Sequence, residues 1–174
     1  MAKVVFIIAK NGFRDEEFLV PYEILKEKGH QISVASNTDS FAIGAGGTEV
    51  KVDLNIKELD PENFDLIVFV GGPGALENLD NEISYNICRK TIQLGKKLAA
   101  ICISPVILAK SGVLKSKRAT VWSSPDHKEP IEILKNQGAI YLEENVVQDE
   151  KIVTANGPHA AEEFGKKLLS ILEE

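Results

Sequence analysis

The chain has 174 residues, of which 44% are hydrophobic and 26% charged, and its formal net charge is −6. These values are typical of a globular protein and exclude a disordered one, and the length fits one domain over residues 1–174. The acidic balance argues against nucleic acid as the principal partner, because phosphate binding needs a cationic face. The apolar start, residues 1–9, is too short for a membrane span and lacks an export cleavage site, so we expect a cytoplasmic protein and no membrane partner.

The first half of the chain alternates strands with a helix. Residues 4–9 predict a strand that is buried on both faces, and residues 14–28 predict a helix that Pro21 kinks or leaves irregular at its start. Gly29 is a suitable C-cap, residues 31–36 predict a second strand, and the glycines at 44, 46 and 47 indicate a small hairpin that uses residues 49–53.

The second half continues this alternation. We expect strands at 65–70, 98–101 and 119–122, helices at 82–94, from 105, at 129–136 and at 160–172, and a hairpin of 146–149 with 151–155 across Glu150. Buried strands alternating with helices predict an α/β fold, a mostly parallel sheet with helices on both faces. Ligands collect at the carboxyl ends of such strands, so Asn11–Gly12, Gly71–Gly72 and Cys102 should come together.

Cys102 lies in the most informative segment, between the strand that ends at Ile101 and a helix that has Pro105 in its first turn. Such a sharp turn crowds the positions two before and two after the cysteine, and these are the small residues Ala100 and Ser104. A helix N-terminus also favours the thiolate, so the pattern indicates a reactive nucleophile with a lowered pKa. The alternative is a small buried cysteine that fills a gap, which is how we interpret Cys88. The two cysteines have no disulfide or metal-ligand pattern, and we expect no metal.

Glu17 stands out among the acidic residues that open the first helix. Asp15 and Glu16 are explained by the helix dipole, whereas Glu17 lies among apolar residues and should be drawn inside. A buried carboxylic acid beside a thiol can remain protonated and donate a hydrogen bond to the thiolate. We therefore expect Glu17 to assist Cys102.

Two further features, the glycine run 71–74 and the histidines, each have two interpretations. The glycine run is neither a Walker loop nor a dinucleotide fingerprint, so no cofactor is expected; it is either a tight turn or a source of backbone N–H donors beside the nucleophile. His127 and His159 either face the cleft or are solvated loop residues, and no Cys–His dyad can be inferred from their positions.

Taken together, these segments resemble the ThiJ/PfpI superfamily, which includes the Parkinsonism-associated deglycase and the archaeal intracellular proteases. The resemblance covers nearly the whole chain. It rests on the first strand, on Glu17 four residues before Pro21, on Gly71–Gly72, and on 99–102 with Pro105; the segment 154–158 is similar to the deglycase branch.

The resemblance implies a flavodoxin-like three-layer sandwich with Cys102 as nucleophile and Glu17 as the protonated carboxyl at its sulfur. It also implies N–H donors from Gly72 and Ile103 and a homodimer or larger assembly. We count the following residues as pocket candidates: Gly71, Ser104, Trp122, Asn156, Pro158, His127 and His159. Three positions depart from the family pattern, since Ile103 replaces a His, Ser104 a Gly, and Trp122 a His or Tyr.

Three functions follow from the resemblance. The first is an enzyme acting on small aldehydes or glycated substrates, a deglycase or glyoxalase-like hydrolase or lyase. The second is an oxidative-stress sensor or chaperone that uses oxidation of Cys102 without turnover. The third is an intracellular cysteine peptidase, which the missing His after Cys102 makes poorly equipped to protonate an amine leaving group.

Overall fold

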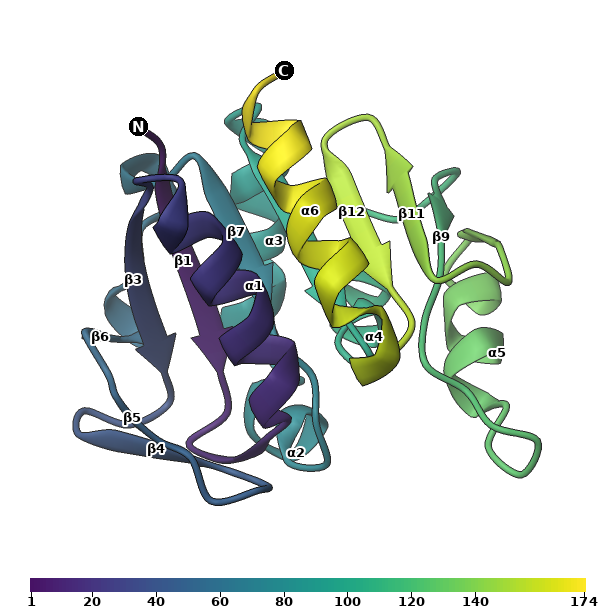
Figure 1. The fold of residues 1–174 in the computed structure, drawn as a ribbon. Coiled ribbons are helices and arrows are strands. Elements are labelled where there is room, and N and C mark those ends of the chain that lie inside the picture. Colours follow the sequence, from purple (N-terminus) through teal and green to yellow (C-terminus); the bar gives the residue numbers. More distant parts are fainter.

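The computed structural model describes all 174 residues as a twisted sheet between two helical layers (Figure 1). The main sheet has seven strands in the order β11-β12-β8-β7-β1-β3-β6, and only the β11–β12 pairing is antiparallel. The strand bounds are β1 Lys3–Ile8, β3 Gln31–Ser36, β6 Leu54–Asn55, β7 Leu66–Phe69, β8 Lys97–Ile101, β11 Val146–Asp149 and β12 Ile152–Ala155. The predicted α/β fold with a mostly parallel sheet is confirmed.

The helices cover both faces. In Figure 1, α1 (Asp15–Glu27) and α6 (Ala161–Leu172) lie in front of the sheet, and α3 (Glu82–Gln93) and α4 (Pro105–Ser111) lie behind it. The remaining helical elements are α2 Ala75–Leu79, α5 Glu129–Asn136, and the 3-10 turns η1 Ile56–Glu58, η2 Pro61–Asn63 and η3 Pro158–Ala160. Helix α1 is continuous from Asp15 to Glu27 with Pro21 inside it, so of the two alternatives predicted for Pro21 the irregular first part is wrong.

Two small sheets flank the main one. The β4–β5 hairpin predicted from the glycines is present and is joined by a third strand; the bounds are β2 Asn11–Phe13, β4 Phe41–Gly44 and β5 Glu49–Lys51. The other sheet pairs β9 (Arg118–Ala119) with β10 (Ile140–Tyr141). The predicted strand over 119–122 therefore fails beyond Ala119. Beyond that residue, Thr120 N–H donates to Thr154 Oγ1 at 2.9 Å and Trp122 N–H donates to the Cys102 carbonyl at 2.8 Å.

The sheet separates two apolar layers because successive side chains of a strand point to opposite faces. Along β1, Val5 and Ile7 belong to the layer under α3 and α4, whereas Phe6 and Ile8 belong to the layer under α1 and α6. Cys102 belongs to the second layer. The pleat thus turns the cysteine toward the face that carries α1.

Candidate active site

A cavity of about 320 Å³ lies at the carboxyl ends of the central strands, beside Cys102. Strand β1 connects to β3 on one side while β7 lies on its other side, so this is the topological switch point where open α/β sheets bind ligands. The cavity is lined by Arg14, Gly72, Pro73, Leu76, Cys102, Ile103, Trp122 and Pro158.

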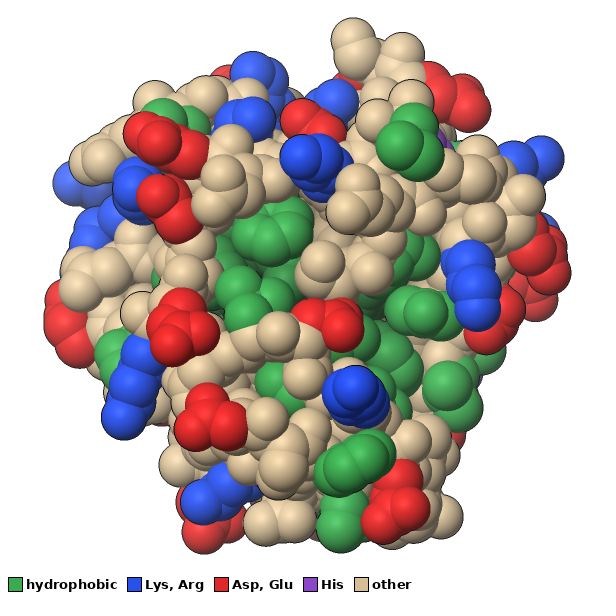
Figure 2. Space-filling model, turned by 90° about the vertical axis from the view of Figure 1, so that its left-hand side faces the viewer, with side chains coloured by type: hydrophobic (Ala, Val, Ile, Leu, Met, Phe, Trp, Pro, Cys, Tyr) green, Lys and Arg blue, Asp and Glu red, His purple; other side chains and the backbone are tan.

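A second hollow contains charged side chains but no thiol, hydroxyl or imidazole. Figure 2 shows the face at the β6 edge of the sheet, where hydrophobic side chains gather in a hollow between charged ones. Next to this edge, η1, η2 and α3 enclose about 490 Å³ without any cysteine, histidine or serine in the lining. The smaller cavity at Cys102 is therefore the candidate site.

Cys102 occupies the strand–helix turn in a left-handed backbone conformation, with φ of 65°. This conformation costs a residue other than glycine about 1 to 2 kcal/mol. Two backbone hydrogen bonds fix it: the Cys102 N–H donates to the Ala155 carbonyl at 2.9 Å, and the Cys102 carbonyl accepts from Trp122 N–H at 2.8 Å. The cysteine is 8% exposed and lines the cavity. The fold thus presents the thiol to the cavity at a cost in backbone strain.

Glu17 is fully buried on the first turns of α1 and lies next to Cys102 across Gly71. A Cβ atom built on Gly71 would lie 2.6 Å from Cys102 Cβ and 2.7 Å from Glu17 Oε1. Neither carboxyl oxygen of Glu17 has a hydrogen-bond partner of regular geometry. The thiol is nevertheless close enough to lower the pKa of the carboxyl. The two groups therefore interact because they lie close together in a buried site, without a well-oriented hydrogen bond between them.

Burial governs the ionisation of this pair. Burial raises the pKa of Glu17 from 4.5 to about 7, against smaller opposing effects of Cys102 and of the Arg14 charge. Burial also raises the pKa of the Cys102 thiol, and the Glu17 carboxylate raises it further. The predicted lowering of the thiol pKa is therefore wrong while Glu17 is ionised. The pair is left with one proton and one negative charge above about pH 7.

Two backbone N–H groups lower the pKa of Cys102 and so oppose the effect of burial. Those of Ile103 and Gly72 lower the pKa of Cys102, because they donate toward its sulfur. Gly72 has φ of 119°, and a Cβ atom there would lie 2.3 Å from the Arg14 nitrogen, so only glycine fits. The N–H groups of Gly72 and Ile103 thus lie near the sulfur, just as the thiol and the Gly71 N–H lie near the Glu17 carboxyl, whose oxygens have no hydrogen bond of regular geometry.

Ser104 is a pocket candidate that the structure places elsewhere. Its hydroxyl is buried and donates to the Val70 carbonyl at 2.8 Å, and it does not line the cavity. The hydroxyl ties the end of β7 to the turn at Cys102 because that carbonyl has no strand partner on this side. Ser104 is therefore a structural link, and its prediction as a pocket residue is wrong.

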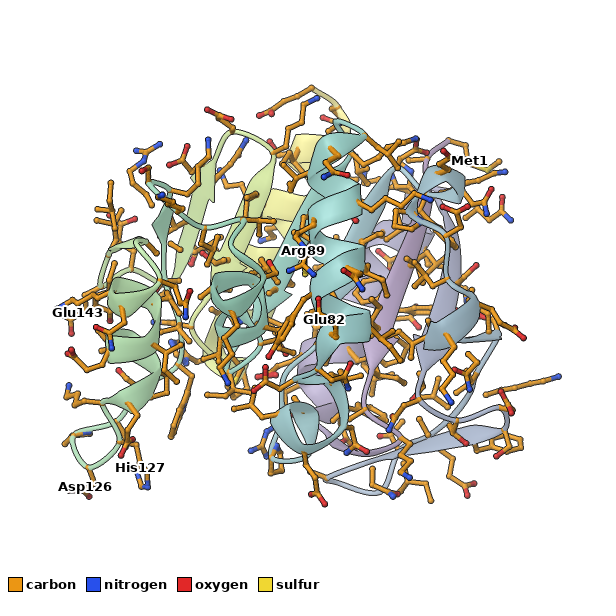
Figure 3. All side chains as sticks on the ribbon, turned by 180° about the vertical axis from the view of Figure 1, so that it is seen from behind. Met1, Glu82, Arg89, Asp126, His127 and Glu143 are labelled. Atoms are coloured by element: carbon orange, nitrogen blue, oxygen red, sulfur yellow. The ribbon has the colours of Figure 1, made fainter.

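The histidines and Asn156 also lie outside the cavity lining. Figure 3 shows His127 at the outer tip of a loop, where it is exposed; its Nδ1 lies 3.1 Å from Ser124 Oγ. The exposed His159 lies 3.3 Å from Asn145 Oδ1 through its Nε2. The Asn156 N–H donates to the Asn145 carbonyl at 3.0 Å. Of the pocket candidates, Trp122 and Pro158 line the cavity, and Gly71 lies beneath it.

Arg14 is the site residue that the sequence analysis did not single out. It precedes α1, its N–H donates to the Gly71 carbonyl at 2.9 Å, and its side chain lines the cavity. The signal available in the sequence was a cation placed directly before the acidic run 15–17. Arg14 was missed because a residue at the start of a helix is interpreted as a cap unless the strand ends that lie beside it are known.

Neither a metal cluster nor a spanning helix is found. No three His, Cys, Asp or Glu side chains gather as metal ligands would. None of the helices combines the length and apolar character that a membrane crossing needs.

Comparison with known proteins finds similar chains of one family. A family model described as the DJ-1/PfpI family matches residues 2–171. A deglycase of Pyrococcus horikoshii is 37% identical over 90% of this chain and 90% of its own. An uncharacterised protein of Methanocaldococcus jannaschii is 38% identical over 99% of this chain and 83% of its own. A glutathione-independent glyoxalase of Caenorhabditis elegans is 26% identical over 90% and 81%.

Solved structures match closely as well. The crystal structure of a ThiJ/PfpI domain protein from Brachyspira murdochii superimposes with a TM-score of 0.92 at 27% identity, covering 98% of this chain and 96% of that one. The resemblance drawn from the sequence motifs is confirmed.

Proposed function

The chain belongs to the DJ-1/PfpI family, and from that premise we propose that it is a cysteine-dependent enzyme acting on small reactive carbonyls. The observation that carries the proposal is the buried Cys102–Glu17 pair beside two N–H donors at the floor of an open cavity. The deglycase and glyoxalase names of its relatives support the same class of substrate.

The reaction begins when the pair carries one proton. Because the pKa of the thiol is raised above that of Glu17, this proton rests on the sulfur, and the reactive form arises when it passes to Glu17 and leaves a thiolate that faces the N–H groups of Gly72 and Ile103. The thiolate adds to the aldehyde carbon of a 2-oxoaldehyde such as methylglyoxal, and the carbonyl oxygen takes the proton to give a hemithioacetal. The same two N–H groups are placed to stabilise the negative oxygen as it forms.

Glu17 then completes the conversion as acid and base. It carries the aldehyde hydrogen, as a proton, from the first carbon to the second by way of an enediol, while the hydroxyl proton passes from the first oxygen to the second, so that the hemithioacetal becomes a thioester of a 2-hydroxy acid. Water hydrolyses the thioester, which releases the hydroxy acid and restores the thiol. A carboxyl with a pKa of about 7 suits both directions of proton transfer near neutral pH.

The experiment measures lactate formed from methylglyoxal by the wild type, Cys102→Ala and Glu17→Gln, with Cys88→Ala as the matched control. We expect Cys102→Ala to abolish the product and Glu17→Gln to slow it about 100-fold, the usual range for a lost acid–base group. The wild-type kcat/KM should rise with pH through about 7, as the pair loses its first proton. Equal lactate from wild type and Cys102→Ala would rule the proposal out.

A redox sensor is the second candidate, favoured by a specific contrast between the two cysteines. Cys102 opens to the cavity, and the donors at its sulfur could hold a sulfinate, whereas Cys88 is fully buried. A peptidase is less well supported, because none of the three histidines lines the cavity. The homodimer and the cytoplasmic location stay predictions, which size-exclusion chromatography with light scattering and cell fractionation can test.

A further inference from the structure

The guanidinium of Arg14 stands out because it has no partner within the protein. The chain has three arginines, and each of the other two pairs with a carboxylate: Arg89 with Glu82 and Arg118 with Asp149. Arg14 makes no ion pair, and its Nε is buried without a hydrogen-bond partner. A buried donor that is left unpaired is costly, so an unpaired guanidinium that lines a cavity suggests a partner supplied from outside.

The surroundings of Arg14 point to the nature of that partner. Arg14 is the only charged residue that lines the cavity, and the rest of the lining is apolar or backbone. Its backbone packs against Gly72, where a Cβ atom would lie 2.3 Å from the Arg14 nitrogen. Arg14 and Gly72 therefore form adjacent parts of the cavity lining, on the side that carries an N–H donor near Cys102.

Glu17 does not serve as the missing partner. Arg14 lowers the pKa of Glu17 through its charge, but no ion pair or hydrogen bond joins the two side chains. Glu17 lies buried and is not part of the cavity lining. The carboxyl thus lies beside the sulfur, within reach of a substrate bound to it, and Arg14 lines the cavity in front of it.

We propose that Arg14 binds a carboxylate of the substrate, so that the site selects carbonyl compounds or adducts carrying one negative charge over neutral ones of the same size. A guanidinium binds a carboxylate through two parallel hydrogen bonds, which would fix the carbonyl end toward Cys102. The single cation matches a single negative charge, which favours a carboxylate over a phosphate. This inference rests on the proposed function for the reacting end of the substrate.

Alkylation of Cys102 tests the inference without any need for turnover. Iodoacetate and iodoacetamide both transfer a carbon to the sulfur and release iodide, and they differ in that the first carries a carboxylate. The ratio of their rates at Cys102, followed by peptide mass spectrometry, cancels changes in thiolate content. We expect Arg14→Gln to lower the iodoacetate-to-iodoacetamide ratio about tenfold, the effect of one lost hydrogen bond to a charged group. Arg14→Lys should restore part of the ratio.

Arg118→Gln is the matched control, since it removes an exposed arginine of the same charge and should leave the ratio unchanged. A ratio that is the same in wild type and Arg14→Gln overturns the inference. Substrate selectivity gives a second readout, using methylglyoxal adducts of N-acetylcysteine and of N-acetylcysteamine, which differ by one carboxylate. We expect Arg14→Gln to reduce kcat/KM for the first adduct about tenfold more than for the second, and an equal reduction would contradict the assignment.

The outcomes separate the two proposals. An unchanged alkylation ratio together with lactate formation that depends on Cys102 refutes the role of Arg14 and keeps the enzyme. A lowered ratio without lactate formation keeps Arg14 as an anion site and refutes the enzyme.

Discussion

The Glu17 carboxyl and the Cys102 side chain meet over Gly71, at a point where a Cβ atom would touch both within 2.7 Å. Three elements supply this contact: α1, the end of β7 and the turn after β8. Because the contact lies in a dry interior, it ties proton binding at Glu17 to the stability of the protein as well as to the thiol.

The pH dependence of stability should reveal the raised pKa of Glu17. A carboxyl whose pKa is about 7 when folded and 4.5 when unfolded binds its proton more tightly in the native state. Its contribution is thus fully favourable below about pH 4.5, and stability is lost as the pH rises to 7. Between pH 5 and 8, the free energy of unfolding of the wild type should fall by roughly 2 to 3 kcal/mol relative to that of Glu17→Gln. Urea unfolding at each pH measures the difference.

Glu23→Gln is the control for that measurement, because Glu23 is an exposed glutamate of the same helix whose charge is not among the influences on Glu17. Its difference from the wild type should stay constant with pH. A constant difference for Glu17→Gln as well would show that the buried carboxyl has an ordinary pKa.

Mild peroxide should distinguish the two cysteines. Burial raises the pKa of both thiols, so access of the oxidant decides between them, and Cys88 is fully buried in α3. Cys102 lines an open cavity, and mass spectrometry should find added oxygen there first. Oxidation of Cys88 before Cys102 would refute both the sensor function and the accessibility of the cavity thiol.

Gly71→Ala should disrupt the pair sterically. The new Cβ would lie 2.6 Å from both Cys102 Cβ and the Ile101 carbonyl oxygen, so the backbone or the side chains must move. We expect a loss of about 2 kcal/mol or more in unfolding free energy and at least a tenfold loss of kcat/KM toward methylglyoxal.

Gly29→Ala provides the comparison for Gly71→Ala. Gly29 has φ of 81° with nothing near its missing Cβ, so the substitution should cost about 1 kcal/mol of backbone strain and leave kcat/KM intact. Wild-type kcat/KM in Gly71→Ala would mean that Glu17 and Cys102 need not be adjacent.

Ser104→Ala should destabilise the protein without changing the chemistry. It removes a buried hydrogen bond of 2.8 Å and leaves the Val70 carbonyl unpaired, which costs about 1 to 2 kcal/mol. Thermal or urea unfolding measures the loss, and Ser124→Ala, in the loop that carries His127, should change stability by less than about 0.5 kcal/mol. If the rate of Cys102 alkylation falls tenfold with Ser104→Ala, the hydroxyl belongs to the site after all.

The amino-acid sequence by itself determined the strands of the main sheet except β6, the helices except α2, and the turn at Cys102. Residues 31–36 and 129–136 match a strand and a helix to the residue, since continuous apolar runs and helical spacing are local signals. The burial of Glu17 among its apolar neighbours was also readable, because the neighbouring residues reveal which face of a helix packs inward.

Only the tertiary structure decided which groups face the cavity and what their surroundings do to them. The Ser104 hydroxyl turned to a carbonyl on β7, the histidines stayed outside, and the Arg14 guanidinium entered the cavity without a partner. The ionisation of Cys102 likewise depends on how deeply the fold buries it beside Glu17. The partners of a polar group and the effect of burial on its pKa depend on segments that are distant in sequence, so no local pattern encodes them.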